Sequence, residues 1–242
     1  QRVFRDAMNK LLADGEEFER LAGKYDGARG NARFIDGLAT LLQSRCGWDV
    51  GPQNIAITNG SQSSFYVLFH LFAGEFNQGK KRKILLPLAP EYIGYADVGM
   101  GADLFHTYRP TIELRGDREF KYHVDFAHLD VSDEIGAIAV SRPTNPTGNV
   151  LTDAEVAQLR ELAIQHEVPF ILDSAYGGPF PNIVFPETEN LWDNNTILCL
   201  SLSKLGLPGL RTGIIVAHEK VIRAVTAANA IVSLAPGSIG PG

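Results

Sequence analysis

The sequence predicts an α/β fold in three layers, α/β/α, with helices on both faces of a mostly parallel central sheet. Beyond about residue 50, short apolar runs rich in β-branched residues alternate with helical patterns. This alternation is typical of βαβ units, whose parallel strands are buried on both faces. The chain has 242 residues, of which 45% are hydrophobic, so it can bury one substantial core.

Six apolar runs are predicted strands. They are Ile55–Thr58, Ile84–Leu88, Ile135–Val140, Pro169–Leu172, Thr196–Leu200 and Gly213–Ala217. No run approaches the roughly 18 apolar residues that a transmembrane helix requires, so no membrane insertion is expected.

Four segments have helical patterns. They are Gln1–Ala13, Asn31–Arg45, a segment after Ser61 that is apolar on nearly every side, and a segment from Asp153 that Thr152 and Glu155 open as a capping box. A helix that is apolar all round, as in the segment after Ser61, is expected in the centre of a large fold.

Charge and cysteine content exclude several classes of function. The 22 basic and 28 acidic residues give a net charge of −6, and no basic block stands out, so neither nucleic acid nor an anionic membrane is an expected partner. Cys46 and Cys199 resemble reduced core thiols, which predicts a cytoplasmic protein. The six histidines show no metal-ligand spacing and form no cluster with cysteine, so no metal site is expected.

Polar and aromatic residues follow five of the predicted strands. They are Gly60-Ser61-Gln62, Pro90-Glu91-Tyr92, Asn145-Pro146, Asp173 with Tyr176, and Ser201-Ser203-Lys204. In open α/β sheets, ligands bind outside the carboxyl ends of the strands. Five runs that deliver such groups to one edge therefore predict a cofactor site.

Lys204 is the most informative of these residues. It follows the apolar run Ile197–Leu200, where a buried lysine is costly unless its amine is used. Burial favours the neutral amine, which is the form that attacks carbonyl groups. Taken alone, a surface lysine at the start of a helix is an equally good interpretation.

A phosphate site is predicted beside this lysine. Arg211, Ser201 and Ser203 offer a guanidinium fork and two hydroxyls, although an arginine in a turn is often only structural. Gly60-Ser61-Gln62 opens the buried helix, whose free N–H groups suit a phosphate, and Ser61 as a simple N-cap fits equally well. A Schiff-base lysine beside a phosphate site suggests pyridoxal phosphate.

Four further residues fit the ring of that cofactor. Asp173 can pair with the pyridinium nitrogen and make the ring an electron sink, although an aspartate after a strand often caps a helix. Tyr176 and Asn145 can bond the phenolic oxygen, and Tyr92 can stack on the ring. Packing for the tyrosines and a structural role in a rigid turn for Asn145 are the alternatives.

From about Tyr25 onward, the chain resembles the fold-type-I pyridoxal-phosphate aminotransferases. The motifs that carry the resemblance are Asn-Pro-Thr-Gly at 145–148, Asp-x-Ala-Tyr at 173–176 and Ser-x-Ser-Lys…Pro-Gly-x-Arg-x-Gly at 201–213. Leu88–Asp97 and Ser141–Val150 most resemble the branch that acts on valine and pyruvate. The spacing of Lys204 and Arg211, one residue shorter than in many relatives, agrees with that branch.

The resemblance implies a role for each site residue. Lys204 holds the cofactor covalently, Asp173 meets the ring nitrogen, Asn145 and Tyr176 contact the ring oxygen, and Tyr92 stacks on the ring. Ser61, Gln62, Ser201, Ser203 and Arg211 hold the phosphate, with Gly60 at the start of the helix. Tyr25 is similar to the tyrosine that these enzymes contribute to the phosphate of the neighbouring subunit, which implies a homodimer with shared active sites.

The resemblance also implies a domain organisation. Residues 1–242 are expected to be the cofactor-binding large domain, with residues 1–30 as a helical segment leading into it. A small domain that carries the arginine for the substrate carboxylate is expected beyond residue 242, and a segment that closes over the substrate is expected before residue 1.

The expected reaction is a ping-pong transfer of an amino group from an L-amino acid, valine or alanine, to a 2-oxo acid, pyruvate or 2-oxoisovalerate. Three alternatives remain at this stage. The first is a pyridoxal-phosphate lyase, decarboxylase or racemase, since the same lysine and aspartate serve all of them. The second is the aminotransferase-like effector domain of a transcription regulator, and the third is a non-catalytic remnant.

Overall fold

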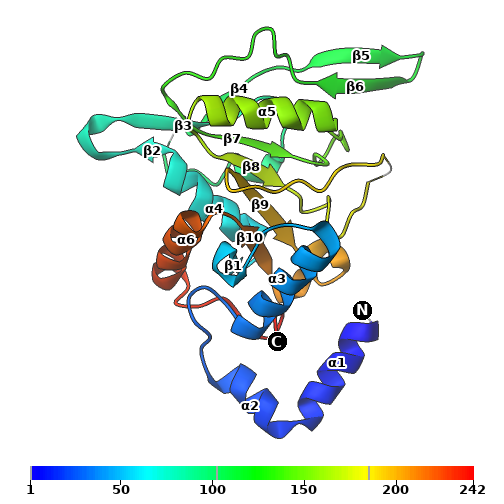
Figure 1. Cartoon of the computed structure of the whole chain (residues 1–242), viewed down its shortest axis with the longest axis vertical. Helices are drawn as coiled ribbons and strands as arrows, with labels where there is room; N and C mark the ends of the chain where they lie inside the picture. Colours follow the sequence, from blue (N-terminus) through cyan, green and yellow to red (C-terminus); the bar gives the residue numbers. More distant parts are fainter. Residues whose placement is uncertain (1, 102, 185) are drawn as a thin grey trace.

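The computed structural model describes residues 2–101, 103–184 and 186–242 and contains one large mixed sheet (Figure 1). In these residues the sheet has eight strands in the order β1-β10-β9-β8-β7-β3-β2, and β4 also pairs with β3. The strands are β1 (Ile55–Thr58), β2 (Gly74–Glu75), β3 (Lys81–Leu86), β4 (Phe105–Thr107), β7 (Ile135–Ser141), β8 (Phe170–Asp173), β9 (Thr196–Ser201) and β10 (Gly213–Val216).

Most strands of the sheet run in one direction, as predicted. The pairs β8–β9, β7–β8, β3–β7 and β3–β4 are parallel. Strand β10 is antiparallel to both of its neighbours, β1 and β9, so β1 points in the same direction as β9. The carboxyl ends of β1, β3, β7, β8 and β9 therefore lie at one edge, and the start of β10 lies there too.

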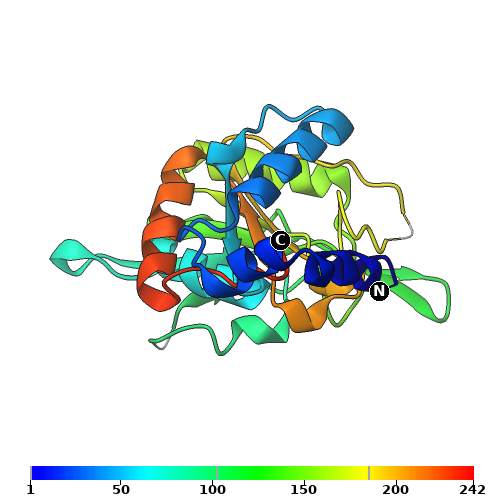
Figure 2. The ribbon, with the colours of Figure 1, turned by 90° about the horizontal axis from the view of Figure 1, so that it is seen from below.

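Helices cover both faces of the sheet, which confirms the three-layer prediction (Figures 1 and 2). The helices are α1 (Arg2–Ala13), α2 (Gly15–Gly23), α3 (Ala32–Cys46), α4 (Ser61–Phe72), α5 (Asp153–Gln165) and α6 (Glu219–Val232). Alternate strand residues enter two separate cores: Ile138 and Val140 pack with α3 and α5, whereas Ala137 and Ala139 pack with α4 and α6. None of the described helices is long and apolar enough to cross a membrane.

The predicted starts of α3 and α5 agree with the structure, whereas no start was predicted for α2 or α6. Thr152 and Glu155 form the predicted capping box of α5, and the Asn31 side chain accepts a hydrogen bond from the Phe34 N–H at the start of α3. At α4 the N-cap is Gly60, which has a φ of 90° that favours glycine, so Ser61 is the first helical residue and not the cap.

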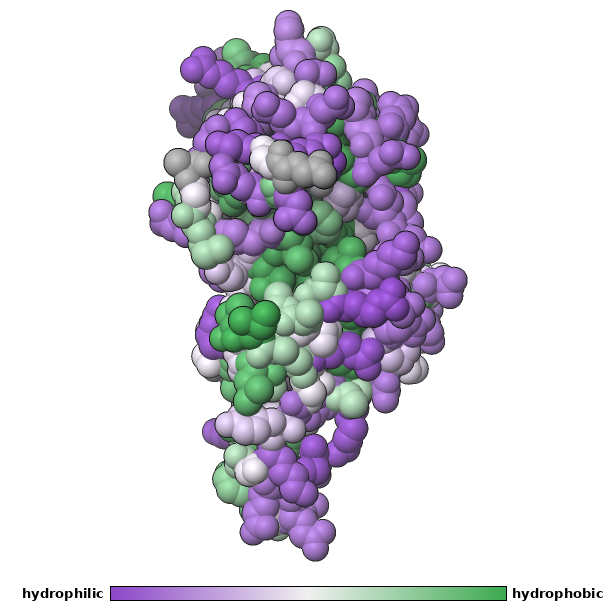
Figure 3. All heavy atoms as spheres, turned by 90° about the vertical axis from the view of Figure 1, so that its left-hand side faces the viewer, coloured by the Kyte–Doolittle hydropathy of each residue, from purple (hydrophilic) through white to green (hydrophobic). Residues whose placement is uncertain are grey.

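The N-terminal segment and α6 leave apolar surface exposed. α1 has no buried residue and extends with α2 away from the sheet, and Gln1 of the predicted helix lies outside the described residues (Figure 1). At the end of α6, Ile231 is 88% exposed, and Val232 and Leu234 are exposed as well. Figure 3 shows an apolar strip between polar regions on the side of the molecule where α6 lies.

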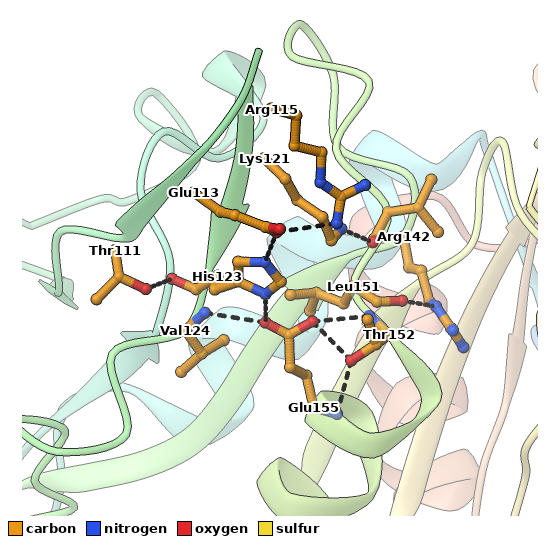
Figure 4. Close-up of polar contacts among 11 residues, drawn as sticks. Thr111, Glu113, Arg115, Lys121, His123, Val124, Arg142, Leu151, Thr152 and Glu155 are labelled. Atoms are coloured by element: carbon orange, nitrogen blue, oxygen red, sulfur yellow. Dashed lines mark hydrogen bonds and ion pairs between the residues drawn. The ribbon is translucent and has the colours of Figure 1, made fainter. Parts of the chain in front are cut away.

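A hairpin outside the sheet, β5 (Thr111–Arg115) with β6 (Glu119–His123), is held to α5 by a polar network (Figure 4). Glu155 is its centre. The carboxylate accepts hydrogen bonds from the Val124 N–H at 3.1 Å and from the Thr152 N–H at 2.8 Å, and its Oε1 lies 3.0 Å from His123 Nδ1. Burial acts to raise the pKa of Glu155, but the bonds from Thr152, Val124 and His123 outweigh it and lower the pKa.

Replacing Glu155 by alanine is expected to destabilise the fold by about 2 kcal/mol, because it leaves the buried Val124 N–H and the Thr152 N–H without their acceptor. A carboxyl whose pKa is lowered by folding stabilises the fold above its unfolded pKa, and that contribution disappears as the pH falls through the folded pKa. Urea unfolding should therefore show a large difference between the Glu155→Ala variant and wild type at neutral pH and a smaller one near pH 3. The exposed Glu161 on the same helix is the control, and equal losses in Glu155→Ala and Glu161→Ala would contradict the prediction.

Candidate active site

A cavity of about 140 Å³ lies at the carboxyl edge of the sheet. Ten of the twelve predicted site residues line it: Ser61, Gln62, Tyr92, Asn145, Asp173, Tyr176, Ser201, Ser203, Lys204 and Arg211. Ser141, Pro143 and Ala175 also line it and were not predicted. The convergence expected from the strand ends is therefore present in the structure.

Lys204 reaches the cavity from a short 3₁₀ turn, Ser203–Leu205, that follows β9. Its ammonium lies 4.7 Å from the centroid of the Tyr176 ring, which is within cation–π distance. The expectation of a buried lysine was wrong: the side chain is exposed, because the turn carries it past the last buried strand residue to the mouth of the cavity. The amine is therefore accessible to a ligand.

Asp173, at the end of β8, is 7% exposed and faces the cavity. Its Oδ1 accepts a hydrogen bond from the Ala175 N–H at 2.9 Å, and its Oδ2 accepts one from the Tyr95 hydroxyl at 2.7 Å. Burial raises the pKa of Asp173 to about 6, although both hydrogen bonds act to lower it. Both of these donors are neutral, so neither offsets the negative charge of the buried carboxylate. A protonated ring nitrogen would be a suitable cationic partner for it.

Tyr95 is a site residue that the sequence did not identify. Its ring is 2% exposed, and burial, followed by the charges of Asp173 and Glu91, raises the pKa of its hydroxyl well above the ordinary value. The hydroxyl therefore stays protonated and donates to Asp173. In the sequence, only the spacing of Tyr95, three residues after Tyr92, pointed to the site. The hydrogen bond from Tyr95 to Asp173 joins positions 78 residues apart and could not be inferred from that spacing.

A cradle for an anion forms where α4 starts beside β10. The N–H groups of Ser63 and Ser64 bond to the Gly60 carbonyl. Within the described chain, this leaves the Ser61 and Gln62 amides at the helix start without backbone partners. A Cβ added at Gly213 would lie 2.6 Å from the Ser61 nitrogen, so glycine there lets β10 approach the helix start.

The Arg211 guanidinium lies against this cradle. A Cβ added at Gly60 would lie 2.7 Å from Arg211 Cζ, so a larger residue there would displace the guanidinium from its present position. Arg211 Nη1 is 3.5 Å from Ser203 Oγ, and Ser201 Oγ accepts from the Ser203 N–H at 3.1 Å. Hydroxyls, free amides and a guanidinium around one hollow are the donor set that a phosphate requires.

Gln62 and Tyr92 line the cavity on the side of α4. The Gln62 amide donates to the Gly94 carbonyl at 2.6 Å, so this side chain joins α4 to the segment that carries Tyr92. The Tyr92 ring meets the Tyr95 ring edge to face, with centroids 5.5 Å apart. The predicted phosphate role of Gln62 is thus left to its backbone amide, because the side chain is already engaged.

Asn145 and Tyr176 also line the cavity. The loop that carries Asn145 is anchored by Arg142, which is 5% exposed and donates to the Leu151 carbonyl at 2.8 Å and to Asp153 at 2.6 Å. The buried Arg142 side chain thus ties the loop to Asp153, which is 40% exposed at the start of α5.

Two predicted residues do not line the cavity. Gly60 supports it from beneath Arg211. Tyr25 is 82% exposed and belongs to the segment after α2, which the bond from the Ile57 N–H to the Arg29 carbonyl holds to β1. Its predicted role in a neighbouring subunit stays a prediction.

Comparison with known proteins agrees with this geometry. The aminotransferase class I and II family matches residues 4–238. The chain is 55% identical over 241 residues to a valine–pyruvate aminotransferase of Escherichia coli K12, covering 100% of this chain and 58% of that protein. The crystal structure of a valine-pyruvate aminotransferase from Salmonella typhimurium LT2 superimposes with a TM-score of 0.90 at 53% identity and covers 100% of this chain and 60% of that one.

More distant relatives share the fold. An N-succinyldiaminopimelate aminotransferase of Mycobacterium tuberculosis, at 22% identity, has a TM-score of 0.80 over 100% of this chain and 60% of that one. The chain thus spans about three fifths of the length of the relatives that it matches. The family match over nearly all residues, together with the identity to the Escherichia coli protein, shows that the chain belongs to the aminotransferase class I and II family.

Proposed function

We propose that this chain is the cofactor-binding part of a pyridoxal-phosphate-dependent aminotransferase that moves an amino group between L-valine or L-alanine and a 2-oxo acid, pyruvate or 2-oxoisovalerate. The observation that carries the proposal is the cavity in which Lys204, Asp173 and the Arg211 cradle face one another. An amine, a buried carboxylate and an anion cradle are the three groups that pyridoxal phosphate requires.

The residues that line the cavity have separate roles in the proposed reaction. When bound, pyridoxal phosphate supplies an aldehyde carbon for a Schiff base and a ring that withdraws electrons from the substrate Cα. Once the substrate amine has replaced it on the cofactor, the freed Lys204 Nζ would carry the proton from the substrate Cα to the cofactor carbon, and the same amine would make the reverse transfer to the Cα of the acceptor. Asp173 would hold the ring nitrogen protonated, Tyr92 would stack on the ring, and Asn145 and Tyr176 would bond its oxygen. The hydroxyls of Ser61, Ser201 and Ser203 with Arg211 would hold the phosphate.

The substrate assignment rests on the relatives. Both the Escherichia coli protein and the Salmonella structure are named for valine and pyruvate, and identities of 55% and 53% support the same pair for this chain. The alternatives within pyridoxal-phosphate chemistry differ in which Cα bond breaks, and no feature of the cavity favours a lyase, decarboxylase or racemase. No observation favours a regulator.

A homodimer is part of the proposal. The exposed Tyr25 and the exposed apolar residues Ile231 and Val232 are surfaces that a second copy would cover, and contiguous exposed apolar area is a mark of protein interfaces. In this arrangement Tyr25 reaches the phosphate of the neighbouring site. The two free cysteines, Cys46 and Cys199, fit the predicted cytoplasmic location.

Amino transfer itself is the test of this proposal. Purified protein with added pyridoxal phosphate is expected to convert L-valine and pyruvate to 2-oxoisovalerate and alanine, with the two products formed in equal amounts. Chromatography of both products measures the stoichiometry. Release of carbon dioxide, D-amino acid or ammonia in place of a paired product would assign the site to another reaction, and a full-length protein inert toward valine and alanine would refute the substrate assignment.

A further inference from the structure

Strand β7 extends past the end of its neighbour β3, and Glu91 fills the gap. The last paired residues of the two strands are Leu85 and Ile138, yet β7 continues to Ser141. In β7 the N–H groups of Ile138 and Arg142 point to β8, where they bond to the Pro169 and Asp173 carbonyls. Successive N–H groups along a strand point to opposite neighbours, so the Ser141 N–H points toward β3. β3 has already ended there and offers it no carbonyl.

The Glu91 carboxylate takes the place of that carbonyl. Its Oε1 accepts a hydrogen bond from the Ser141 N–H at 2.9 Å, and its Oε2 accepts from the Ser141 hydroxyl and, at 3.2 Å, from the Tyr92 N–H. One side chain thus ties the turn after β3 to the end of β7. The turn carries Tyr92 and the end of β7 leads into the loop of Asn145.

Each of these contacts lies next to a wall of the cavity. Ser141 and Tyr92 both line it, whereas Glu91 stands behind them. Ser141 is also the register partner of Asp173 across β7 and β8. Ser141 and Tyr92 bond to Glu91, and Asp173 and Tyr95 interact with it electrostatically; none of these four groups is a cation.

We propose that Glu91 is a positioning residue for the cofactor, which holds the stacking ring of Tyr92 and the Ser141 wall in register with Asp173. This inference rests on the proposed function. Burial raises the pKa of Glu91 to about 7, with the charge of Asp173 as a smaller contribution, while the bonds from Ser141 and Tyr92 act to lower it. A carboxyl that is costly to bury without a cation is consistent with a role in placing its neighbours.

The test measures how tightly and in what orientation the protein holds its cofactor. The protein is titrated with pyridoxal phosphate, and the dissociation constant and the visible circular dichroism of the bound cofactor are recorded for Glu91→Ala, Glu91→Gln and wild type. Glu91→Ala is expected to weaken binding about 10- to 100-fold, as for other residues that orient a direct ligand, and to reduce the dichroic band. Glu91→Gln keeps an acceptor for the Ser141 N–H but places an NH2 donor opposite the Tyr92 N–H, so its binding should lie between that of Glu91→Ala and that of wild type.

Glu75→Gln, on the exposed strand β2, is the matched control and should leave both readings unchanged. Binding and dichroism in Glu91→Ala equal to those of the control would overturn the inference. If wild type itself bound no cofactor, the proposed function would fail instead, and thermal melting of each apo-protein separates lost positioning from lost folding.

Discussion

Replacing Lys204 by alanine is expected to abolish covalent attachment of the cofactor and to lower kcat by at least about 10³-fold, since the same amine binds the cofactor and moves the Cα proton. The exposed Lys204 touches the Tyr176 ring and makes no ion pair in the described part of the chain, so its loss should leave the fold intact. Borohydride reduction followed by mass measurement of the peptide tests the attachment directly. Wild type should gain the cofactor mass at Lys204, and the variant should gain none.

Lys220→Ala is the control for this experiment, because Lys220 lies at the start of α6, remote from the cavity lining. It should retain both the reducible attachment and the activity. Borohydride-stable cofactor in the Lys204→Ala variant, or trapping at another lysine of the wild type, would show that the assignment of Lys204 is wrong. Weak non-covalent binding in the variant is compatible with it, since the phosphate cradle is unchanged.

Asp173→Asn is the second large effect. Asparagine has the shape of aspartate but no charge, so the ring nitrogen would lose its anionic partner in a buried place where an unpaired charge is costly. We expect a fall in kcat of about 10²-fold or more and weaker cofactor binding. Steady-state kinetics at saturating cofactor separate the two effects.

The pH dependence of cofactor binding provides an independent check. Since burial raises the pKa of Asp173 to about 6 in the free protein, the carboxyl is protonated below that pH and cannot pair with a protonated ring. Cofactor affinity should therefore fall as the pH drops through about 6 in wild type but not in Asp173→Asn. Tyr95→Phe removes a bond that lowers the pKa of Asp173, so it should move this fall to higher pH. An Asp173→Asn variant with the wild-type pH profile would contradict the assignment.

Hydrophobic patterning predicted most of the sheet. The run Ile55–Thr58 is β1 without change, and Ile135–Val140 and Thr196–Leu200 each fall one residue short of their strands. The run at Ile84–Leu88 was less accurate, because β3 begins with the charged residues Lys81–Lys83 at the sheet edge and ends at Leu86. A buried strand is predictable because both of its faces must be apolar, whereas the charged end of a strand such as β3 carries no such pattern.

Features that depend on contacts between distant residues were missed. The hairpin of β5 and β6 carries charged residues along both strands and resembles a polar loop in the sequence. The roles of Glu91 and Tyr95 could be recognised only from their hydrogen bonds to Ser141 and Asp173, which are 50 and 78 residues away in the sequence. The motif residues were predicted because their chemistry is recorded in residue type and spacing, but the exposure of Lys204 depends on the geometry of one turn.

The reversed strand β10 has a consequence for folding kinetics. Lys204 and Arg211 lie in the connection between β9 and β10. This hairpin is expected to form early in folding, because closing so short a loop costs little entropy. β10 also pairs with β1, more than 150 residues earlier in the chain, and such remote pairing slows folding. The Gly60 half of the phosphate cradle therefore joins the Arg211 half only when β1 and β10 pair. A cofactor that contacts both halves would stabilise this long-range contact. Unfolding of the native protein should therefore slow as the concentration of the cofactor rises.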